Sequence, residues 1–477
     1  MKILYAGSEA VPFAATGGLG DVMGSLPAAV KKALGDDGDV RAVLPLYPSV
    51  RENFGDRLTT VWEGEVSLAW RRQYMGILSC ESCGVTYYFI DNEQYFKRHS
   101  YYGDFDDGER FAFFSAAVLE MLSVIDFFPD IIHANDWQSA LIPVYLRLWY
   151  GGRTEYDPIR TVYTIHNIAY QGIYSPEILW DVFGIWDRDR HLLDYDGAVN
   201  LTKGAIVTAD RITTVSPSYA DEILTEHYSH GLCHILRDNS HKLSGIINGI
   251  DTDKYDPKSD PNIAQNYSAK KISDRAVCRD ELCRICEFED DRTPIVAMVS
   301  RLASHKGFDL VERVIREMLD AGDARFVLLG TGERRYEDYF KYLDQIYAGR
   351  FRAFITFDPS LASKIYAGAD MFLMPSESEP CGLAQMIASR YGCVPIVRET
   401  GGLRDTIMPL RDDTGEGNGF TFANYNAHDM MYTIRRAVSV YKSKRRWNTL
   451  VRRTMSMDFS WDRSAAEYVR LYKELTE

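Results

Sequence analysis

The sequence predicts an α/β protein made of two doubly wound domains, each a mostly parallel sheet between layers of helices. Three observations carry this prediction. The chain has 477 residues, more than a single hydrophobic core usually supports. Short apolar runs alternate with helical patterns along almost the whole chain, as in parallel sheets joined by crossover helices. The glycine-rich turn TGGL occurs at residues 16–19 and again at 400–403, which indicates two similar halves.

The first domain is expected over residues 1–250. Its strand-like runs are KILYAGS, RAVLPLY, DIIHAND, TVYTIHN, RITTVS and KLSGIIN, and RFAFFSAAVLEMLSVI is a helical pattern between two of them. Residues 65–91 are rich in β-forming side chains and are interpreted as a hairpin insertion. The N-terminal run is interpreted as a strand rather than a signal peptide, because Glu9 interrupts a brief apolar stretch.

The second domain is expected over residues 251–458. A polar stretch with two prolines follows NGID at 248–251, and the interdomain linker is placed there. The strand-like runs that come after it are PIVAMVS, RFVLLG, FRAFITF, MFLMPS and VPIVRE. The last segment, 459–477, is amphipathic and could pack back onto the first domain as a helix.

Composition excludes several classes of protein. The net charge of −14 argues against a partner that is a nucleic acid or an anionic membrane, and no apolar run is long enough for a transmembrane helix. The CxxC pairs Cys80/Cys83 and Cys283/Cys286 are interpreted as small core residues, with zinc or redox chemistry as the alternative. Because nothing requires an oxidising compartment, we expect a cytoplasmic protein.

Candidate ligand groups in the first domain lie in loops that follow strands, where doubly wound domains bind their ligands. Gly17 and Gly18 leave backbone N–H groups unshielded, and a helix expected to begin near Asp21 adds a partial positive charge. This loop suits a phosphate or a sugar hydroxyl, and a tight turn without a ligand is the alternative. Residues 133–137 and 166–167 end two further strands, where a histidine is as often structural as functional.

The second domain has two such loops with charged side chains. Arg301 and Lys306 follow one strand and suit a pyrophosphate, with solvated surface charges as the alternative. The turn GTGE at 330–333 is too short for a dinucleotide fingerprint, which disfavours a hydride-transfer enzyme. In PSESEPCGLAQ, Glu379 precedes a proline that restricts its conformation, and a helix expected to begin at Cys381 offers N–H groups to an anion. A carboxylate beside an anion site suits a sugar phosphate.

Together these motifs resemble the bacterial glycogen synthases, also called starch synthases. The resemblance rests on SEAVPFAATGGLGDV, HANDWQ, TIHNIAYQG, TVSPSYADEI, NGID, SRLASHKG and SESEPCGLAQ…TGGLRDT, in the family's order over essentially the whole chain. It implies the GT-B architecture, in which two Rossmann-like domains face a central cleft and the C-terminal helix returns to the first domain. It also implies transfer of glucose from ADP-glucose to the non-reducing end of an α-1,4-glucan, with retention of configuration and with no metal or other cofactor.

Two other functions stay open at this point. One is a GT-B sugar-nucleotide epimerase, and the other is a catalytically weak, glucan-binding homologue. A metal is not expected, because the DxD spacing of Asp251 and Asp253 falls at the linker rather than at the end of a strand.

The resemblance also implies roles for individual residues. Arg301 and Lys306 would hold the diphosphate, His166 the donor glucose, and Glu379 the glucose hydroxyls, so these four are the expected catalytic residues. Phe357 would lie against the base of the donor. The remaining donor-binding positions would be Gly17, Gly18, Asp21, Asn248, Gly332, Cys381, Gly382, Leu383 and Ala384, and the acceptor-binding positions would be Asp136 and Trp137.

Two positions depart from the family pattern. The family has lysine immediately before the first TGGL, where this chain has Ala15. Because that lysine is expected to touch the donor phosphate, its absence should weaken donor binding by about 1–3 kcal/mol. Ala384 stands where threonine is common, and this change is milder because the backbone amides remain.

Overall fold

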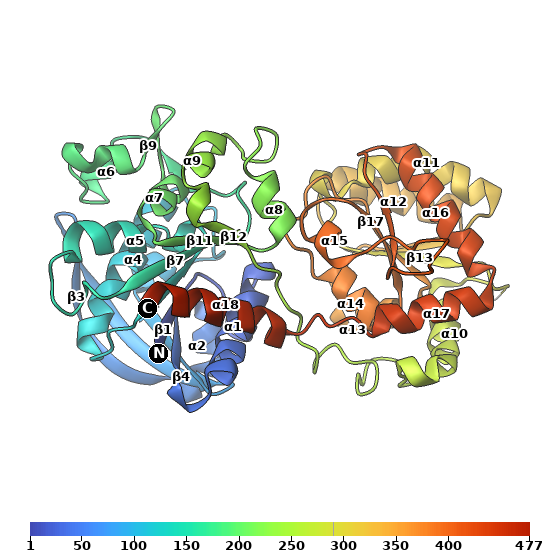
Figure 1. Ribbon diagram of the computed structural model, residues 1–477, viewed down its shortest axis with the longest axis horizontal. Coiled ribbons are helices and arrows are strands. Elements are labelled where there is room, and N and C mark those ends of the chain that lie inside the picture. The colour runs from blue at the N-terminus through green and yellow to red at the C-terminus, as the bar shows by residue number, and fades with distance from the viewer. Residues whose placement is uncertain (290) are drawn as a thin grey trace. The chain divides into compact units, whose positions relative to one another are not determined.

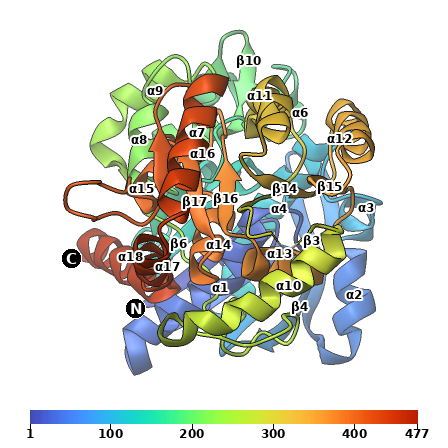
Figure 2. The same ribbon diagram turned by 90° about the vertical axis from the view of Figure 1, so that its right-hand side faces the viewer.

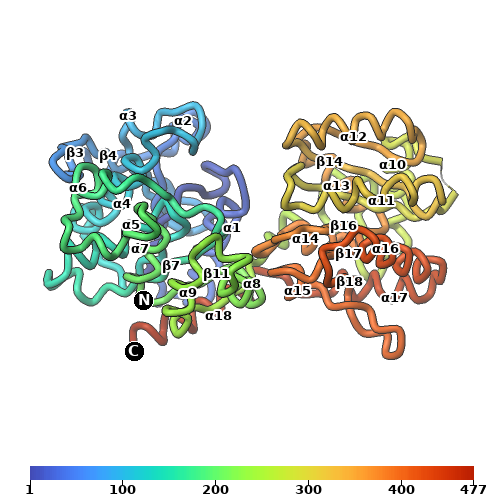
Figure 3. The backbone as a smooth tube through the Cα atoms, turned by 90° about the horizontal axis from the view of Figure 1, so that it is seen from above, coloured from blue at the N-terminus to red at the C-terminus, as the bar shows by residue number. Residues whose placement is uncertain are grey.

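The structure is a computed structural model that describes residues 1–289 and 291–477 (Figure 1). The chain divides into two compact units. Unit 1 comprises Met1–Gly249 and Trp461–Glu477, and unit 2 comprises Ile250–Ser460. The chain enters and leaves unit 2 side by side, since the Ile250 amide donates to the Phe459 carbonyl at 2.8 Å. Both termini therefore lie in unit 1 (Figure 3).

Unit 1 is organised around one large sheet with the strand order β12-β11-β7-β6-β1-β2-β5-β4-β3. Within this sheet, as far as the structure describes it, β4 alone runs against its neighbours, and the other pairs are parallel. The strands of this sheet are β1 (Lys2–Ala6), β2 (Asp39–Pro45), β3 (Thr59–Leu68), β4 (Arg71–Ser82), β5 (Val85–Asp91), β6 (Ile131–Asn135), β7 (Arg160–Ile165), β11 (Arg211–Thr214) and β12 (Leu243–Gly245).

The β-rich segment at 65–91 is part of this sheet. The expected hairpin exists, because β3 and β4 pair antiparallel through the turn at Ala69 and Trp70. It is not a separate insertion, since β5 pairs with β4 on one side and in parallel with β2 on the other. The reason is burial: the β5 sequence VTYYFID is apolar on both faces, so it needs cover on both sides of the sheet.

Helices cover the sheet of unit 1, and a short sheet of β8 (Ile173–Tyr174), β10 (Ala198–Asn200) and β9 (Asp194–Tyr195) lies in the same unit. The predicted helix RFAFFSAAVLEMLSVI corresponds to α4 up to Val124, and its last residue, Ile125, is the C-cap. Helix α4 buries side chains around most of its circumference. The helices of unit 1 are α1 (Gly18–Leu34), α2 (Pro48–Phe54), α3 (Glu93–Phe96), α4 (Asp107–Val124), α5 (Leu141–Tyr145), α6 (Ile178–Asp181), α7 (Leu201–Thr208), α8 (Pro217–Glu222), α9 (Cys233–Asp238) and α18 (Trp461–Thr476).

The C-terminal helix α18 completes the core of unit 1 by packing on α1. Its Tyr472 is fully buried, and the Tyr472 hydroxyl lies 2.8 Å from the Tyr5 hydroxyl and 2.6 Å from His133 Nδ1. Tyr5 and His133 belong to β1 and β6, the two central strands of the sheet. The last helix of the chain is thus joined to the strands from which the site loops of unit 1 depart.

Unit 2 is a parallel sheet with the strand order β15-β14-β13-β16-β17-β18, which is the order 3-2-1-4-5-6 of the Rossmann fold. Figure 2 shows α11, α12 and α16 on one side of this sheet and α10, α13, α14 and α17 on the other. The strands are β13 (Ile295–Val299), β14 (Arg325–Leu329), β15 (Phe351–Phe354), β16 (Met371–Met374), β17 (Val394–Arg398) and β18 (Phe420–Phe422). The helices are α10 (Arg275–Cys286), α11 (Phe308–Ala321), α12 (Arg334–Ile346), α13 (Pro359–Gly368), α14 (Ala384–Arg390), α15 (Gly401–Thr406), α16 (Ala427–Tyr441) and α17 (Lys444–Met455).

The cysteines form no disulfide in the part of the chain that the structure describes. Cys80, Cys283 and Cys286 are buried, whereas Cys83 is exposed at the turn after β4. No group of three or more His, Cys, Asp or Glu side chains among the described residues is arranged to hold a metal ion. The helices described are also too short or too polar for any of them to cross a membrane.

Candidate active site

In both units several of the expected site residues follow the strands at which the strand order reverses, and the others follow neighbouring strands. In unit 1 the strand β1 has β2 on one side and β6 on the other. In unit 2 the strand β13 has β14 on one side and β16 on the other. The loops after the two strands at such a switch point leave the sheet in opposite directions and open a crevice, which is where doubly wound domains bind ligands.

The loop after β1 reaches α1 sooner than expected. The helix begins at Gly18, with Gly17 as its N-cap, rather than near Asp21. Asp21 lies in the first helical turn, where its carboxylate is favoured by the helix dipole. The helix extends to Gly18 because glycine at the N-cap and at N1 needs no side-chain contact, and neither Gly17 nor Gly18 has a neighbour within 4 Å of an added Cβ.

A buried carboxylate already occupies part of this loop. Glu9 is 3% exposed, and it accepts hydrogen bonds from the Thr16 hydroxyl at 2.6 Å and from the Gly17 amide at 3.3 Å. The Tyr102 hydroxyl donates to the same carboxylate at 2.7 Å. The interpretation of unshielded amides is therefore wrong for Gly17, because Glu9 takes that N–H group. Glu9 and Tyr102 are site residues that the motif analysis missed.

Ala15 is exposed and lies directly against the first turn of α1. A Cβ atom added to Gly20 would come within 2.5 Å of the Ala15 Cβ, so the loop approaches the helix only because position 20 is glycine. The consequence is that a longer side chain at position 15 would start beside the helix N-terminus, at the place where a phosphate would bind.

His166 and Asp136 join the ends of β6 and β7. The Asp136 carboxylate accepts from the His166 amide at 2.8 Å, and the Asp136 amide donates to Thr164 at 2.9 Å. Asp136 holds this position with φ of 56°, an uncommon conformation for a residue other than glycine. Burial raises the pKa of the Asp136 carboxyl to about 7, against the His166 and Asn167 amides that favour its ionised form.

His166 is a neutral imidazole with a defined tautomer. Burial lowers its pKa to about 3. Its Nε2 lies 2.9 Å from Asn135 Oδ1, and the Asn135 amide nitrogen donates to the carbonyls of Ala6 and His133, which fixes the orientation of the amide. Since Oδ1 can only accept, the proton is on Nε2 of His166. The Nδ1 atom is left as an acceptor for a ligand hydroxyl.

Two other expected residues of unit 1, Trp137 and Asn248, differ in whether they can still bind a ligand. Trp137 packs against the Phe111 ring with centroids 5.1 Å apart and is half-buried. Asn248 is 5% exposed, and its Oδ1 has no hydrogen-bond partner among the described residues. A buried acceptor without a partner is costly unless a ligand satisfies it, so Asn248 fits a binding role better than Trp137 does.

In unit 2 the structure brings two of the expected catalytic residues into contact. Lys306 Nζ lies 2.7 Å from Glu379 Oε2, and the Ser376 hydroxyl donates to the same oxygen at 3.0 Å. Glu379 is 7% exposed. The loops after β13 and β16 are also joined through the backbone, since the Glu377 amide donates to the His305 carbonyl at 2.9 Å. The half-buried cation and the buried carboxylate thus form one ion pair at the switch point.

Arg301 lies on the same loop and is exposed, and its guanidinium makes no ion pair among the described residues. The next residue, Leu302, exchanges backbone hydrogen bonds with the GTGE turn, accepting from the Glu333 amide at 2.7 Å and donating to the Thr331 carbonyl at 2.9 Å. Gly332, within this turn, forms a β-bridge with Leu302. The loop after β14 therefore supports the loop that carries both cations.

The helix of the EPCGL motif begins later than expected. Helix α14 starts at Ala384, with Leu383 as its N-cap, so Cys381 and Gly382 precede it. Cys381 is buried, and Gly382 has φ of 72°, a conformation that favours glycine. The Gln385 side chain donates to the Gly382 carbonyl at 2.8 Å and holds the turn in place. The amides available at the helix N-terminus are therefore those at Leu383 and Ala384 rather than at Cys381.

The second TGGL packs on the EPCGL loop. The Gly402 amide donates to the Glu379 and Pro380 carbonyls, each at 3.1 Å. A Cβ atom added to Gly402 would come within 2.5 Å of the Cys381 Cα. The repeated turn therefore has a different task in each half: the first begins α1 beside Ala15, and the second supports the backbone around Glu379.

Phe357 is 86% exposed after β15, directly before α13. The Asp358 side chain caps this helix by accepting from the Leu361 amide at 3.0 Å. The cap fixes the backbone next to Phe357 while the ring stays free for a stacking partner.

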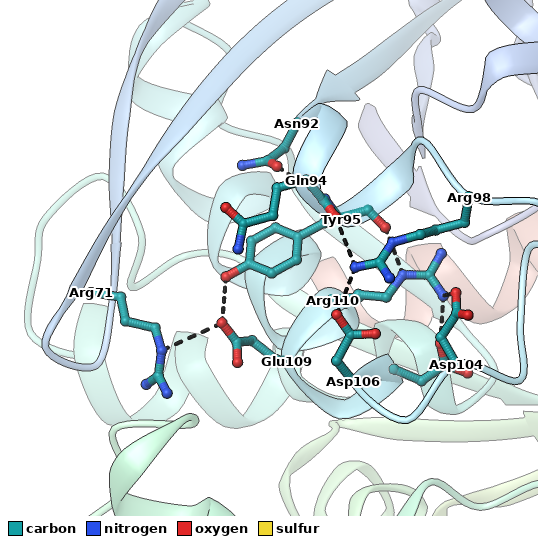
Figure 4. Close-up of polar contacts among 10 residues, drawn as sticks. Arg71, Asn92, Gln94, Tyr95, Arg98, Asp104, Asp106, Glu109 and Arg110 are labelled. Atoms are coloured by element: carbon teal, nitrogen blue, oxygen red, sulfur yellow. Dashed lines mark hydrogen bonds and ion pairs between the residues drawn. The ribbon is translucent and has the colours of Figure 1, made fainter.

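A dense polar cluster between α3 and the start of α4 was not anticipated from the motifs (Figure 4). Arg110 is fully buried, donates to the Tyr95 carbonyl at 2.6 Å and pairs with Asp104 at 3.1 Å. Arg98 pairs with Asp106 at 2.7 Å. These bonds fix the loop that carries Phe105, whose ring is 96% exposed.

Comparisons with known proteins decide the family. Residues 2–238 match the starch synthase catalytic domain, and residues 285–453 match the glycosyl transferases group 1. A glycogen synthase of Anoxybacillus flavithermus is 48% identical over 100% of this chain and 98% of its own length. A glycogen synthase of Clostridium novyi is 47% identical over 100% and 99%.

The chain belongs to the glycogen and starch synthase family.

Solved structures agree with this assignment. The catalytic domain of starch synthase IV from Arabidopsis thaliana, bound to ADP and acarbose, has a TM-score of 0.89 at 34% identity and covers 100% of this chain and 99% of its own. Sucrose-phosphate synthase from Thermosynechococcus elongatus has a TM-score of 0.62 at 18% identity, over 99% and 98%, and shows the fold alone. The chain is a GT-B glycosyltransferase built from Rossmann-like units, which confirms the fold class predicted from the sequence.

Proposed function

We propose that this glycosyltransferase moves glucose from ADP-glucose to the non-reducing end of an α-1,4-glucan with retention of configuration. The observation that carries the proposal is the ion pair of Lys306 with the buried Glu379 carboxylate at the switch point of unit 2. It places a cation for a phosphate beside a carboxylate for sugar hydroxyls. The glycogen synthase relatives supply the substrate class. We place the reaction in the cytoplasm as part of the same proposal.

Arg301 and Lys306 are the proposed diphosphate ligands. Each charge-assisted hydrogen bond to a phosphate oxygen is worth about 1.5–3 kcal/mol. The amides at Leu383 and Ala384 add partial positive charge at the start of α14. Because these donors are in place before the bond breaks, they stabilise the charge that develops on the leaving diphosphate.

Retention follows if the acceptor hydroxyl approaches on the face from which the diphosphate departs. The anomeric carbon then gains oxocarbenium character as its C–O bond to the phosphate breaks. The acceptor oxygen forms the new C–O bond to the anomeric carbon, and the departing phosphate oxygen takes the proton of the acceptor hydroxyl. Glu379 holds the sugar hydroxyls instead of attacking the anomeric carbon, because Lys306 and Ser376 already bind its carboxylate. A retaining glycosidase would require a second carboxylate about 5 Å away.

His166 is proposed to bind the donor glucose through Nδ1. Its low pKa keeps the ring neutral at physiological pH, so it accepts a hydrogen bond from a sugar hydroxyl and does not act as a general acid. Asn248 Oδ1 is a second acceptor for the donor, since it has no partner in the described chain.

Incubation of the protein with radiolabelled ADP-glucose and glycogen tests this function. We expect label in the polymer, no interconversion of the free nucleotide sugar, and full activity in EDTA, because no metal is part of the proposal. Lower incorporation from UDP-glucose in a parallel reaction would support ADP-glucose as the donor. Conversion of the nucleotide sugar without polymer labelling would show an epimerase, and recovery only with added Mn²⁺ would show a metal enzyme.

Variants test the assigned roles. Glu379→Gln should lower kcat by about 100-fold or more, the range for a polar group that acts in the transition state, without trapping a covalent glucosyl enzyme. Arg301→Ala should raise the KM for ADP-glucose. Arg334→Ala, which removes another exposed cation of unit 2, is the matched control and should change neither value. A trapped glucosyl enzyme would contradict the role given to Glu379.

A further inference from the structure

Unit 2 has a histidine beside the proposed diphosphate ligands that the mechanism above does not use. His305 is the middle residue of the short turn η8 (Ser304–Lys306), so it lies in sequence between Arg301 and Lys306. Its side chain is half-buried. Imidazole is the side chain whose ordinary pKa lies closest to neutrality. The loop that supplies both cations therefore also carries a group that can gain a proton near physiological pH.

The turn that carries His305 is held by the loops after the two neighbouring strands. The Glu377 amide, in the loop after β16, donates to the His305 carbonyl at 2.9 Å. The Ser304 amide donates to Glu333 Oε1, after β14, at 2.8 Å. Gly307, which ends the turn, has φ of 76° and packs so closely on the loop after β16 that an added Cβ has no room. The backbone of His305 is thus fixed where the loops after β13, β14 and β16 meet.

The charged side chains of these three loops set the protonation of the His305 imidazole. Burial lowers the pKa of this group, and the Lys306 and Arg301 cations lower it further. The Glu379 and Glu333 carboxylates act in the opposite direction. Because burial and the two cations outweigh the two carboxylates, the pKa lies below its ordinary value and the ring is neutral at physiological pH.

Two other carboxylates lie on the elements that pack around the turn. Asp309, in the first turn of α11, accepts from the Tyr425 hydroxyl at 2.5 Å. Glu377 precedes Glu379 in the loop after β16. Both shift the pKa of His305 less than the four charged groups of the proposed donor site do. The state of this imidazole therefore depends chiefly on what occupies that site.

A bound diphosphate reverses the balance of charge at His305. Each of the two phosphoryl groups of a nucleotide sugar carries a negative charge at neutral pH. Held by Arg301 and Lys306, these charges offset the two cations that disfavour protonation, and an anion within about 4–6 Å raises the pKa of an imidazole. Both ring nitrogens of the protonated form are donors. The imidazolium can then give a charge-assisted hydrogen bond to a phosphate oxygen.

We propose that His305 is a third donor-binding cation, which takes up a proton from the solvent as the diphosphate binds. The proposal rests on the proposed function, because it takes the nucleotide diphosphate to lie on Arg301 and Lys306. Linkage is reciprocal, so a donor that draws a proton into the site also binds more tightly when protons are more available. One coupled proton changes the affinity by up to about tenfold per pH unit. ADP-glucose should therefore bind more tightly as the pH falls from about 8 toward 6.

Calorimetry without a glucan measures this proton uptake apart from turnover. ADP-glucose is titrated into the protein near neutral pH in buffers that differ in their enthalpy of ionisation. ADP-glucose is the probe because its substituted diphosphate does not titrate in this range, whereas the terminal phosphate of free ADP does. We expect the apparent enthalpy of binding to depend on the buffer for the wild type, with an uptake of up to about one proton per donor. It should not depend on the buffer for His305→Gln, whose side chain has no charge to gain.

Two further variants separate His305 from the other groups that titrate near neutrality. His428 is an exposed histidine at the start of α16, so His428→Gln is the matched control and should take up the wild-type number of protons. Asp136 has its pKa raised by burial to about 7, and a donor that reaches unit 1 would raise it further and also draw in a proton. Uptake that persists in His305→Gln and disappears in Asp136→Asn would overturn the proposal.

Steady-state kinetics gives a second readout. The wild-type KM for ADP-glucose should fall about tenfold between about pH 8 and 6, and His305→Gln should flatten this profile. His305→Lys, whose charge does not titrate in this range, should give a low KM at both values. A merely structural role would lower kcat or stability without changing the slope of the KM profile.

The outcomes distinguish this inference from the proposed function. Binding of ADP-glucose by the wild type with the same enthalpy in every buffer would overturn the role of His305 and leave the proposed function standing. No binding of ADP-glucose by the wild type would contradict the proposed function itself.

Discussion

At the residue scale, the loop after β1 combines a missing cation with a buried anion. Ala15 stands where the family has lysine, and the Glu9 carboxylate accepts hydrogen bonds from the Thr16 and Gly17 amides. A phosphate approaching this loop meets the N-terminus of α1 without a local positive side chain. If the donor binds at this loop as proposed, unit 1 gives its phosphate weaker electrostatic support than the family pattern implies.

Ala15→Lys should lower the KM for ADP-glucose. The new lysine side chain would start beside the exposed first turn of α1, and its ammonium group would add a contact with the donor phosphate. That contact is worth about 1–3 kcal/mol, which is about ten- to a hundredfold in affinity. Steady-state kinetics with glycogen in excess measures the change. Ala15→Gln is the control, since it adds similar length without charge. An equal KM for the wild type and the lysine variant would show that position 15 does not contact the donor.

Glu9 positions the TGGL loop without touching the substrate in this proposal. Glu9→Gln should raise the KM for ADP-glucose more than it lowers kcat, because the loop loses a charged acceptor for four donors while the groups around Glu379 stay in place. The conservative Tyr102→Phe should show a smaller effect of the same kind, since it removes one of those bonds. A loss confined to kcat would contradict a positioning role.

At the scale of elements, the repeated TGGL shows how one sequence motif can serve two structural purposes. In α1 it provides a helix N-terminus beside an exposed loop, with open space around Gly17 and Gly18. In α15 it provides a close backbone contact, because Gly402 lies on the Cys381 backbone and donates to Glu379 and Pro380. The motif alone does not separate the two, since the difference lies in what packs against the glycines.

Gly402→Ala should therefore impair catalysis and leave glucan binding unchanged. The added methyl group collides with the Cys381 backbone and displaces the loop that carries Glu379, at a cost of about 1–3 kcal/mol for overpacking. We expect a large fall in kcat with glucan binding unchanged, measured by initial rates and glycogen cosedimentation. Gly55→Ala, at a glycine with no neighbour within 4 Å of an added Cβ, is the control and should be close to neutral.

The strands predicted from the sequence agree with the structure better than the predicted helix starts do. The strand-like runs correspond to β1, β2, β6, β7, β11 and β12 of unit 1 and to β13, β14, β15, β16 and β17 of unit 2, because alternating apolar runs and helices leave few other solutions. No predicted run covers β18. The predicted first residues of two helices were wrong by three positions. Helix α1, after β1, begins three residues earlier than predicted, and α14, after β16, begins three residues later. Glycine and proline near a helix terminus allow more than one starting residue, so neighbouring packing sets the boundary.

At the scale of the whole molecule, the stability of unit 1 depends on groups far apart in sequence. His133 on β6 is bound by Tyr472 from α18 and by the Thr164 hydroxyl from β7. Burial lowers the pKa of His133 to about 3, as it does for His166. The C-terminal helix thus helps to cover an imidazole that must stay neutral.

Stability should fall as the pH drops from about 6.5 toward 3. In that range the unfolded chain protonates these histidines and the native state does not, which costs about 1.4 kcal/mol per pH unit for each imidazole. Asp136 opposes this between about 4 and 7, since its raised pKa leaves the native carboxyl protonated while the unfolded one ionises. Because two histidines outweigh one aspartate, these three groups together lower the free energy of unfolding in acid.

His133→Asn should reduce this slope by about 1.4 kcal/mol per pH unit. Urea unfolding followed by tryptophan fluorescence reports chiefly on unit 1, since of the tryptophans only Trp447 lies in unit 2. Tyr472→Phe is the matched control: it loosens the same contact and should lower stability at every pH without changing the slope. A slope unaltered by His133→Asn would mean that the imidazole is not neutral in the native state.

The sequence by itself determined the fold class, the family and the motif loops, because hydrophobic periodicity and strand-end motifs depend on neighbours along the chain. Only the tertiary structure decided that Glu9 holds the first TGGL, that the second TGGL supports Glu379, and that exposed tryptophans meet in one cavity. Glu9 lies close to the first TGGL in sequence but carries no pattern that marks the contact. Glu379 and the second TGGL are about twenty residues apart, and the tryptophans, from Trp70 to Trp186, span more than a hundred. Their proximity follows from the order of the strands and the packing of helices between them, which no single stretch of sequence encodes.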